Sequence, residues 1–505
     1  MGSSDWFLGI DLGTGSCKSV VVDARTRILG FGLSGYSGGD VREQNAESMP
    51  EAVAASMIAA IADAGVKGSN CAGLSLGGAL HGIMAVDAHG IPLTGVMTWA
   101  DGRAVAKSDR VKGMPISSEL YRACGCPVHP TYPLYKILWL REERPAIFCK
   151  SSRFISAKEY VLQRITGEYM VDYSLAAGTG LLNIHKLQWE PQALQLAGIA
   201  EDRLSTLCSP TTVHHGLDPL FASRTGLQKD VPVAVGSSDA ANSSLGAGAV
   251  LPGQATCMLG TSGALRVFAH SPVLDSKART WCYAVDETHW LVGGAINNGG
   301  VALSWLKDIL NQGFRHLPPE ALLSFEDVLN LAAKAGAGAG GLICLPFIAG
   351  ERSPNWNANA RAAFFGMTLD HNAVHLSRAL LEGIAFRLRS VDEALAEAGC
   401  HIDHIIASGG FVKSEFWLQL VSDVLNRELT VPKWGETSSL GAAFWAILAV
   451  GGNKSLESLA AAAEMDRSLS PDPGNVSVYS RLYSLYRKLY RCASALFDEI
   501  AETNI

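Results

Sequence analysis

The stretch "FLGIDLGTGSCKSVVVD", residues 7–23, decides the fold, because two apolar β-branched runs flank a short break rich in Gly, Thr and Ser. Two glycines allow a tight turn that exposes backbone N–H groups, so the stretch predicts the turn of a β-hairpin over residues 7–36. The amides and hydroxyls of the turn attract an anion, whereas the carboxylate of Asp11 repels one unless a cation stands between them. The tip therefore predicts a site for phosphate plus a metal ion, with an ordinary polar turn as the alternative.

The same pattern recurs in "ATCMLGTSGALRVFA", residues 255–269, where a Gly-Thr-Ser-Gly turn again separates two apolar strands. The remaining predicted elements alternate in type, with helices at 46–64, 374–396 and 414–425, strands at 72–76, 83–86, 97–99 and 404–410, and an irregular helical region at 103–230. This recurrence predicts two related α/β halves, residues 1–250 and 251–505. Two phosphate turns in such a duplication favour a nucleotide held in the cleft between the halves.

Composition narrows the class of protein. The 505 residues are 48% hydrophobic and 18% charged, which indicates more than one domain and argues against disorder. The net charge of −7, without a Lys/Arg run, makes nucleic acid an unexpected partner. Eleven scattered cysteines without a C-x-x-C pair, and an N-terminus without a leader pattern, predict reduced thiols in the cytoplasm. The apolar runs fall short of a membrane span, so no membrane association is expected.

Asp239 is the strongest candidate for a catalytic group. It lies between the predicted strand "VPVAV" and a helix, the place where ligands gather in open α/β sheets. A carboxylate in the first turn of a helix is stabilised as the anion, which suits a general base. The alternative is that Asp239 only caps the helix. A second candidate loop, "ASGGFVKSEFW", brings two glycines and Ser414 to a helix start, where backbone can approach a ring or a phosphate.

One motif points to a different chemistry. Residues 73–77 fit G-x-S-x-G, the nucleophile turn of serine hydrolases. That motif requires a strand, a sharp turn and then a helix. Here the residues that follow predict a turn and another strand, so the hydrolase reading is disfavoured.

Six motifs, in one order, resemble the FGGY family of carbohydrate kinases, within the actin/sugar kinase/Hsp70 superfamily. They are "GIDLGTGSCKSVVVD", "GLSLGGALHGIMAVD", "VGSSDAANSSLGAG", "LGTSGAL", "SGGFVKSEFWLQLVSDVL" and "ETSSLGAAFWA", and the resemblance spans residues 7–450. It implies an α/β fold of two duplicated ribonuclease H-like domains around a nucleotide cleft. The first domain would hold the sugar and phosphate, and the second would hold the nucleotide.

The resemblance also implies residue roles. Asp239 would be the general base that takes the proton of the sugar hydroxyl, and Asp11 would hold Mg²⁺. ATP would contact Gly13, Thr14, Gly15, Ser16, Lys18, Gly260, Thr261, Ser262, Gly300, Ser304, Gly410 and Ser414. Leu80 and His81 match the sugar-contacting pair of the family. The other sugar-site candidates are Trp99, Asp101, Arg103 and His129.

Within the family, stretches such as "MTWADGRA" (97–104) and "CPVHPTYPLYKILWL" (126–140) are most similar to gluconokinases. The expected reaction is ATP-dependent phosphorylation of the terminal hydroxyl of D-gluconate, giving 6-phospho-D-gluconate. A kinase of xylulose or another polyol, and a non-catalytic nucleotide-binding regulator, remain alternatives, and a homodimer is left open. A substrate carboxylate would need a cation or donors, for which His81, Arg103 and His129 are candidates. Arg103 has the alternative role of an internal partner of Asp101, and Gly15 and Gly102 depart from the family pattern.

Overall fold

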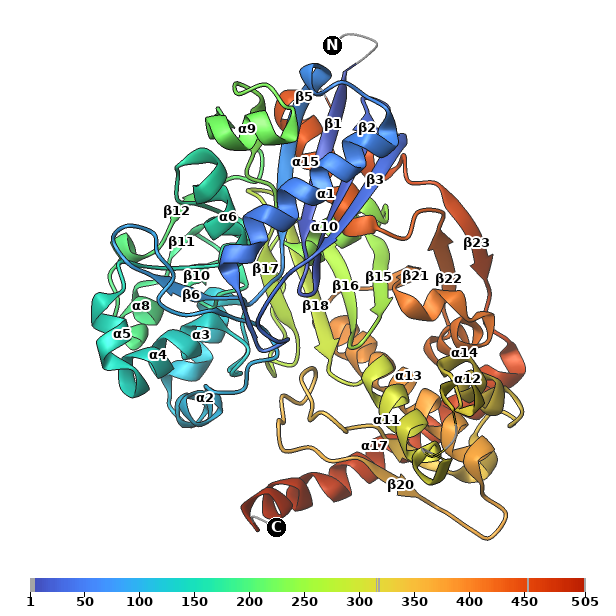
Figure 1. Cartoon of the computed structure of the whole chain (residues 1–505). Helices are drawn as coiled ribbons and strands as arrows, with labels where there is room; N and C mark the ends of the chain where they lie inside the picture. Colours follow the sequence, from blue (N-terminus) through green and yellow to red (C-terminus); the bar gives the residue numbers. More distant parts are fainter. Residues whose placement is uncertain (1–4, 315, 317, 452–453, 504–505) are drawn as a thin grey trace.

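The computed structural model describes residues 5–314, 316, 318–451 and 454–503. It contains two α/β halves, each built around its own sheet, and both predicted hairpins form (Figure 1). In the first, β1 (Trp6–Leu12) and β2 (Ser16–Asp23) are antiparallel, and the Gly13 amide closes the turn on the Ser16 carbonyl at 3.1 Å. The expected fold class is confirmed.

The first sheet extends this hairpin. Strand β3 (Ile28–Gly35) pairs with β2, so residues 7–36 form a three-stranded meander rather than a single hairpin. On the other side β1 pairs in parallel with β5 (Cys71–Gly78). The sheet has the order β13 (Val213–His215), β14 (Pro232–Ala234), β5, β1, β2, β3. Ser75 of the G-x-S-x-G motif is fully buried inside β5, which excludes a nucleophile turn.

The second sheet repeats the plan and begins with the second hairpin. Its strand order is β17 (Trp281–Ala284), β18 (Trp290–Ile296), β16 (Gly263–Ala269), β15 (Gly253–Leu259), β21 (Ile402–Ser408), β22 (Glu428–Pro432) and β23 (Met465–Leu469). As in the first sheet, the first strand of the hairpin pairs in parallel with a later strand, here β15 with β21. The duplication predicted from the two turns is therefore present in the strand pairing.

Helices cover both faces of the first sheet. Helix α1 (Met49–Ala64) packs against β3 so closely that a Cβ on Gly32 would lie 2.0 Å from the Ser56 carbonyl oxygen. The opposite face is covered by α15 (Thr437–Val450), which comes from the far end of the chain (Figure 1). A Cβ on Gly9 of β1 would lie 2.1 Å from the Ser439 carbonyl oxygen. The two halves thus interlock, and the first sheet depends on residues after 430.

Helix α10 (Asp239–Gly246) packs tightly against α15 at the junction of the halves. A Cβ on Gly441 of α15 would lie 2.0 Å from the Asn242 carbonyl oxygen of α10. Trp445 Nε1 donates to Asn242 Oδ1 at 2.8 Å. Ser244 of α10 also bonds Thr256 of β15 through their hydroxyls, at 2.8 Å. Helix α10 therefore connects both sheets.

The first half carries a helical insertion between β5 and β14, as the sequence predicts for residues 103–230. Its helices are α2 (Val105–Lys112), α3 (Ile116–Cys124), α4 (Pro133–Glu143), α5 (Pro145–Lys150), α6 (Ala157–Thr166), α7 (Tyr173–Ala177), α8 (Pro191–Ala197) and α9 (Pro219–Thr225). Short strand pairs accompany the insertion. Strand β4 (Glu43–Gln44), which precedes β5 in the chain, pairs with β7 (Val96–Met97), and the other pairs are β6 (Met84–Val86) with β8 (Arg153–Ile155), β9 (Met170–Asp172) with β12 (Thr206–Cys208), and β10 (Leu182–Asn183) with β11 (Gln188–Trp189).

Besides α15, the described part of the second half contains a further set of helices. They are α11 (Gly300–Leu310), α12 (Phe325–Ala333), α13 (Ala373–Glu397), α14 (Glu415–Leu425), α16 (Leu456–Ala460) and α17 (Pro473–Glu502), with the pair β19 (Ile343–Leu345) and β20 (Ala363–Phe365). Among the described residues, no helix combines the length and apolar character that crossing a membrane would need. All eleven cysteines are free thiols.

Candidate active site

Asp239 is the first residue of α10 and stands where the two halves meet. Its Oδ1 accepts from the amide of Ala240 at 2.8 Å and from the amide of Leu80 at 3.3 Å. The helix is capped instead by the hydroxyl of Ser238, which accepts from the Ala241 amide, so Asp239 is not the N-cap. Burial raises the pKa of the Asp239 carboxyl above its ordinary value, and the positive charge of Arg266 opposes that rise.

The first phosphate turn brings Asp11 close to Asp239. Asp11 lies opposite Lys18 across the hairpin, and its Oδ1 is buried without a hydrogen-bond partner in the described residues. Burial, together with the negative charge of Asp239, raises the pKa of Asp11 to about 7. Lys18 Nζ crosses to Glu436 Oε2, 2.5 Å away, just before α15. Two neighbouring carboxylates with an orphaned oxygen are the arrangement that a bound cation would stabilise.

The rest of that turn is open to a ligand. Thr14 accepts from Trp99 Nε1 through its hydroxyl at 3.1 Å, which joins the turn to the predicted sugar residues. Gly15 is exposed, and a Cβ there would meet nothing within 4 Å. Gly13 and Ser16 close the turn between them. The tip at Gly15 therefore leaves open space beside the backbone, which a phosphate site requires.

The second turn forms one wall of a cavity of about 620 Å³. The residues that line it include six of those predicted to contact the nucleotide: Gly260, Thr261, Gly300, Ser304, Gly410 and Ser414. The Gly300 amide, at the start of α11, donates to the Gly260 carbonyl at 2.7 Å and anchors this wall. Ser414 is the N-cap of α14. Predicted residues from three separate segments thus converge on one cavity. Ser262 lies in the same turn as Thr261 but is not among the lining residues.

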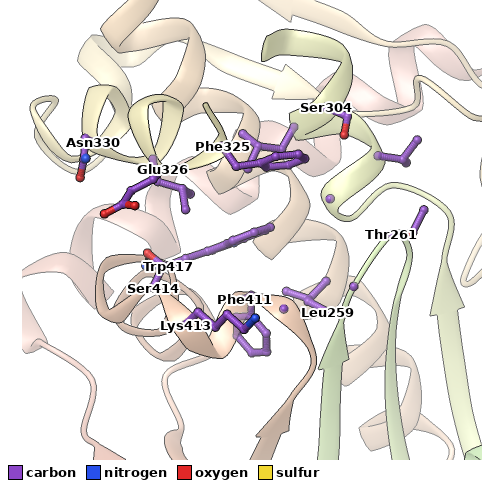
Figure 2. A pocket seen from close by; sticks show the side chains of 16 residues that line it. Leu259, Thr261, Ser304, Phe325, Glu326, Asn330, Phe411, Lys413, Ser414 and Trp417 are labelled. Carbon is purple, nitrogen blue, oxygen red and sulfur yellow. Dashed lines mark hydrogen bonds between the residues drawn. The ribbon is translucent and has the colours of Figure 1, made fainter. Parts of the chain in front are cut away.

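Two aromatic rings that the sequence analysis did not single out shape this cavity. Figure 2 shows Phe325 of α12 and Trp417 of α14 facing each other across it, with Thr261 and Ser304 to one side and Glu326 and Asn330 to the other. Phe325 is 43% exposed, whereas Trp417 is buried. Flat rings on opposite walls favour a stacked base, with its phosphates toward Thr261.

The sugar candidates lie on the first half, beside the phosphate turn. His81 adopts a left-handed backbone conformation with φ of 68°, and its Nδ1 is 2.8 Å from the Gly178 carbonyl oxygen. Lys136 holds this region from beneath, since its fully buried Nζ donates to the carbonyls of His81 at 2.8 Å, Met97 at 3.2 Å and Thr98 at 2.6 Å. Burial lowers the pKa of His81 to about 3, so its imidazole is neutral at physiological pH.

His129 lies next to an arginine that the sequence analysis did not select. Its ring contacts Trp356 edge-on at 5.3 Å between centroids, and its Nδ1 accepts from the Thr131 amide at 3.3 Å. Burial and the nearby charge of Arg352 hold the pKa of His129 well below its ordinary value. His129 can therefore offer an N–H donor but not a positive charge. The cation beside it is Arg352, whose guanidinium lies 5.4 Å from the ring centre of Trp99.

Arg103 has the internal role that the sequence left open. Its Nε donates to Asp101 Oδ2 at 2.7 Å, and its Nη2 also bonds Glu43. The guanidinium lies over the ring of Trp139 at 5.0 Å. With two carboxylates already held, Arg103 and buried Asp101 shape the loop after Trp99 rather than reach for a substrate carboxylate.

The site therefore contains two buried arginines that motif reading missed. Arg352 stands in "GERSPNW" and Arg266 in "GTSGALRVF", and each is a charge beside or within an apolar run. Both side chains are more than nine-tenths buried. A charged residue predicted to lie within a core strand was the available signal, because such residues are rarely buried without a function or partner.

Comparisons with known proteins cover almost the whole chain. Residues 6–246 match the N-terminal domain of the FGGY family of carbohydrate kinases, and residues 255–450 match the C-terminal domain of that family. A gluconokinase of Bacillus subtilis is 34% identical over 99% of this chain and 98% of its own length. A xylulose kinase of Staphylococcus epidermidis is 30% identical over 98% of both chains.

The similar solved structures are also of a gluconate kinase and a xylulose kinase. The crystal structure of a gluconate kinase from Lactobacillus acidophilus matches with a TM-score of 0.91 and 31% identity, covering 98% of this chain and 99% of that one. The structure of a ligand-bound xylulose kinase from the same organism also has a TM-score of 0.91, with 30% identity over 98% of this chain and all of the other. The proteins that this chain resembles in sequence and fold thus include kinases of gluconate and kinases of xylulose.

Proposed function

This chain belongs to the FGGY family of carbohydrate kinases, an assignment that makes it an ATP-dependent sugar kinase, and we propose that its sugar is D-gluconate, phosphorylated on the terminal hydroxyl to 6-phospho-D-gluconate. The observation that carries the choice of sugar is Arg352. It is a buried cation beside His129 and Trp99, among the residues predicted for the sugar, and a guanidinium suits a substrate carboxylate. The slightly higher identity to a gluconokinase supports the same choice.

The guanidinium of Arg352 is held in a fixed orientation that suits binding of a carboxylate. Its Nε donates to Asn297 Oδ1 at 2.6 Å and its Nη2 to the Ile296 carbonyl at 3.2 Å, so the planar group is fixed in orientation. A fixed guanidinium fork recognises a carboxylate through two parallel hydrogen bonds. His129 would add a neutral N–H donor beside Arg352. Of the two roles expected for His129, cation or donor to the substrate carboxylate, we propose only that of donor.

The mechanism follows from the two ends of the cleft. With the carboxylate at Arg352, the far end of the sugar reaches Asp239, whose two backbone hydrogen bonds fix its carboxylate. Asp239 would orient the terminal hydroxyl and accept its proton as the oxygen bonds to phosphorus. The amides of both hairpin turns would stabilise the charge spread over the transferred group, and closure of the halves would exclude water as a competing acceptor.

We further propose that the site binds Mg²⁺ with ATP. The fit rests on Asp11, whose buried oxygen lacks a partner, and on its neighbour Asp239. No group of three metal-binding side chains occurs among the described residues, which agrees with a Mg²⁺ that takes one or two carboxylates and completes its shell from phosphates and water. Bound there, the ion would supply charge neutralisation for the β- and γ-phosphates.

The deciding experiment compares kcat/KM for D-gluconate, D-xylulose, D-ribulose and glycerol by coupled ADP release. We expect gluconate to be preferred. In Arg352→Gln, kcat/KM should fall about 10–100-fold for gluconate, as one charged hydrogen bond of roughly 1.5–3 kcal/mol is lost, and much less for the uncharged polyols, which serve as the internal control.

A tenfold preference of the wild type for xylulose would overturn the choice of gluconate and leave the kinase assignment intact. An equal loss on all four substrates in Arg352→Gln would show a structural role for this arginine. If no sugar of a wide panel gave turnover while ATP bound, the non-catalytic regulator would be the better reading.

A further inference from the structure

Arg266 is a buried cation with unpaired N–H groups in the described part of the chain. It lies in β16, a strand whose neighbouring residues are apolar, and its side chain is only 9% exposed. In the described part of the chain, neither its Nε nor its Nη1 makes a hydrogen bond. A guanidinium cannot shed its charge at physiological pH, so leaving its N–H groups unpaired in the interior is costly. Such a group is retained where a ligand completes it.

The space in front of Arg266 is small. Arg266 lines a cavity of about 130 Å³ together with Asp239 and Lys18. Ligands of drug size occupy roughly 300–1,000 Å³ and one water about 30 Å³. The cavity therefore suits neither a nucleoside nor a sugar, but it suits a phosphoryl group with a few waters.

The walls of this cavity favour an anion. The N-terminal residues of α10 (Asp239, Ala240) and of α15 (Thr437, Ser438) both contribute to its lining, and helix N-termini carry partial positive charge. Lys18 is already paired with Glu436. Arg266 thus brings the uncommitted N–H donors to a cavity that also holds the predicted base.

We propose that Arg266 is a catalytic residue that donates its free N–H groups to the phosphoryl group during transfer. In that step the sugar hydroxyl oxygen forms a bond to the γ-phosphorus, and the bond from that phosphorus to the β,γ-bridging oxygen breaks. The electron pair leaves with ADP, and the hydroxyl proton passes to Asp239. Charge develops on the equatorial oxygens of the phosphoryl group, where a desolvated guanidinium is most effective.

Arg266 and Arg352 would then have different roles in the site. Arg352 is the cation beside His129, at the end proposed for the carboxylate. Arg266 is the cation whose charge acts on Asp239, at the end where the phosphoryl group moves. The inference about Arg266 rests on the kinase chemistry of the family and is independent of which sugar is used.

The first test is Arg266→Gln, assayed with whichever sugar gives the highest kcat/KM in the wild type. We expect kcat to fall about 10²–10³-fold, as for removal of one preorganised donor, with little change in the affinity for ADP or for the sugar alone. Calorimetry with ADP, aluminium fluoride and the sugar in magnesium buffer, a mimic of the group in transfer, should show loss of tight binding. Arg361→Gln, at an exposed arginine outside the cavity, is the matched control.

The second test is Arg266→Lys, which keeps the positive charge but replaces the planar guanidinium with a single ammonium group. Its kcat should still fall, because one ammonium group cannot occupy the positions of the guanidinium N–H groups.

Three results would overturn the proposal. One is that folded Arg266→Gln keeps more than a tenth of the wild-type kcat. Another is that its affinity for ADP or sugar falls as far as kcat does. The last is that Arg266→Lys and Arg266→Gln bind the aluminium fluoride complex as tightly as the wild type. If Arg266→Gln does not fold, the proposal is tested with Arg266→Lys alone, by its kcat and by its affinity for the aluminium fluoride complex.

Discussion

At the scale of single residues, Asp239 can be replaced by a residue that keeps its hydrogen bonds but not its basicity. Asn can keep both backbone hydrogen bonds through its Oδ1, but it cannot take a proton. We expect Asp239→Asn to bind a non-hydrolysable ATP analogue almost as well as the wild type, measured by calorimetry. Its kcat should fall about 10²–10⁴-fold, the usual contribution of a general base.

Asp308→Asn, at an exposed carboxylate on α11, is the control for this variant. If folded Asp239→Asn retained more than a tenth of the wild-type kcat, another group would have to be the base.

Lys136 provides a pH-dependent prediction about stability. Burial lowers its pKa to about 7, far below the ordinary value for lysine, although three carbonyls accept from its Nζ. Between pH 7 and about 10 the unfolded chain therefore binds more protons here than the folded chain does, and stability rises with pH by at most about 1.4 kcal/mol per unit. That gain is lost as pH falls through the folded pKa.

The melting temperature of the wild type should thus rise relative to that of Lys136→Met as the pH increases from 7 to 9.5. A constant difference over this range would show that Lys136 has an ordinary pKa.

Sequence motifs predicted those residues of the candidate site that lie in or beside turns, but not the candidate residues that lie elsewhere. Asp11, Thr14 and Asp239 stand beside glycines at strand ends, and their chemistry is readable from that context. Arg266 stands inside a strand, and Phe325 opens a helix that is distant in sequence from any motif. Their role depends on which surfaces meet in three dimensions, and no local pattern carries that information.

At the scale of elements, the first turns of α12 and α14 line the cavity that we propose for the nucleotide base (Figure 2). Removing one wall should weaken stacking, which is worth about 1–3 kcal/mol per base. We expect Phe325→Ala to raise the Kd for ATP by about 5–100-fold, with little change in the KM for the sugar. Calorimetry with ATP analogues measures the first quantity and steady-state kinetics the second.

Phe314→Ala is the matched control, since Phe314 is also exposed but does not line the cavity. An unchanged ATP affinity in Phe325→Ala would mean that the base lies outside the space between the two rings.

The contact between α10 and α15 gives a prediction about packing. Gly441 has no room for a Cβ, because the Asn242 carbonyl oxygen would be 2.0 Å away. Gly441→Ala should destabilise the protein by about 1–3 kcal/mol, the usual cost of overpacking, and lower the melting temperature. Because both helices begin at the catalytic cavity, kcat should fall as well.

Gly336→Ala controls for the loss of glycine, since a Cβ at that position meets nothing within 4 Å. A melting temperature of Gly441→Ala equal to that of the control would show that the two helices can separate without cost.

The long elements were predictable because their patterns are strong. Helix α13 and strand β21 lie within two residues of the ranges expected from periodicity. Short strands were placed less well: the strand expected at 97–99 is β7 (Val96–Met97), a two-residue pair with β4. Such a strand is defined by its partner, and Glu43 and Gln44 carry no strand pattern of their own.

At the scale of the whole molecule, the two glycine-rich turns were enough to predict a duplicated fold with a nucleotide between its halves. They could not predict that α15 covers the sheet of the other half. That placement follows from side chains meeting across the junction, such as Trp445 with Asn242. A boundary near residue 250 remains our proposal for the sequence, although the packing of the two halves crosses it.

This interlocking has a consequence for how the protein is made. A ribosome adds about 5–20 residues per second, and α15 emerges roughly 190 residues after the first half is complete, so a newly made first sheet waits roughly 10–40 seconds for its cover. During that time the apolar face of β1 and β5 is open to solvent. An exposed apolar face favours aggregation, so the nascent chain is most vulnerable before α15 has been synthesised.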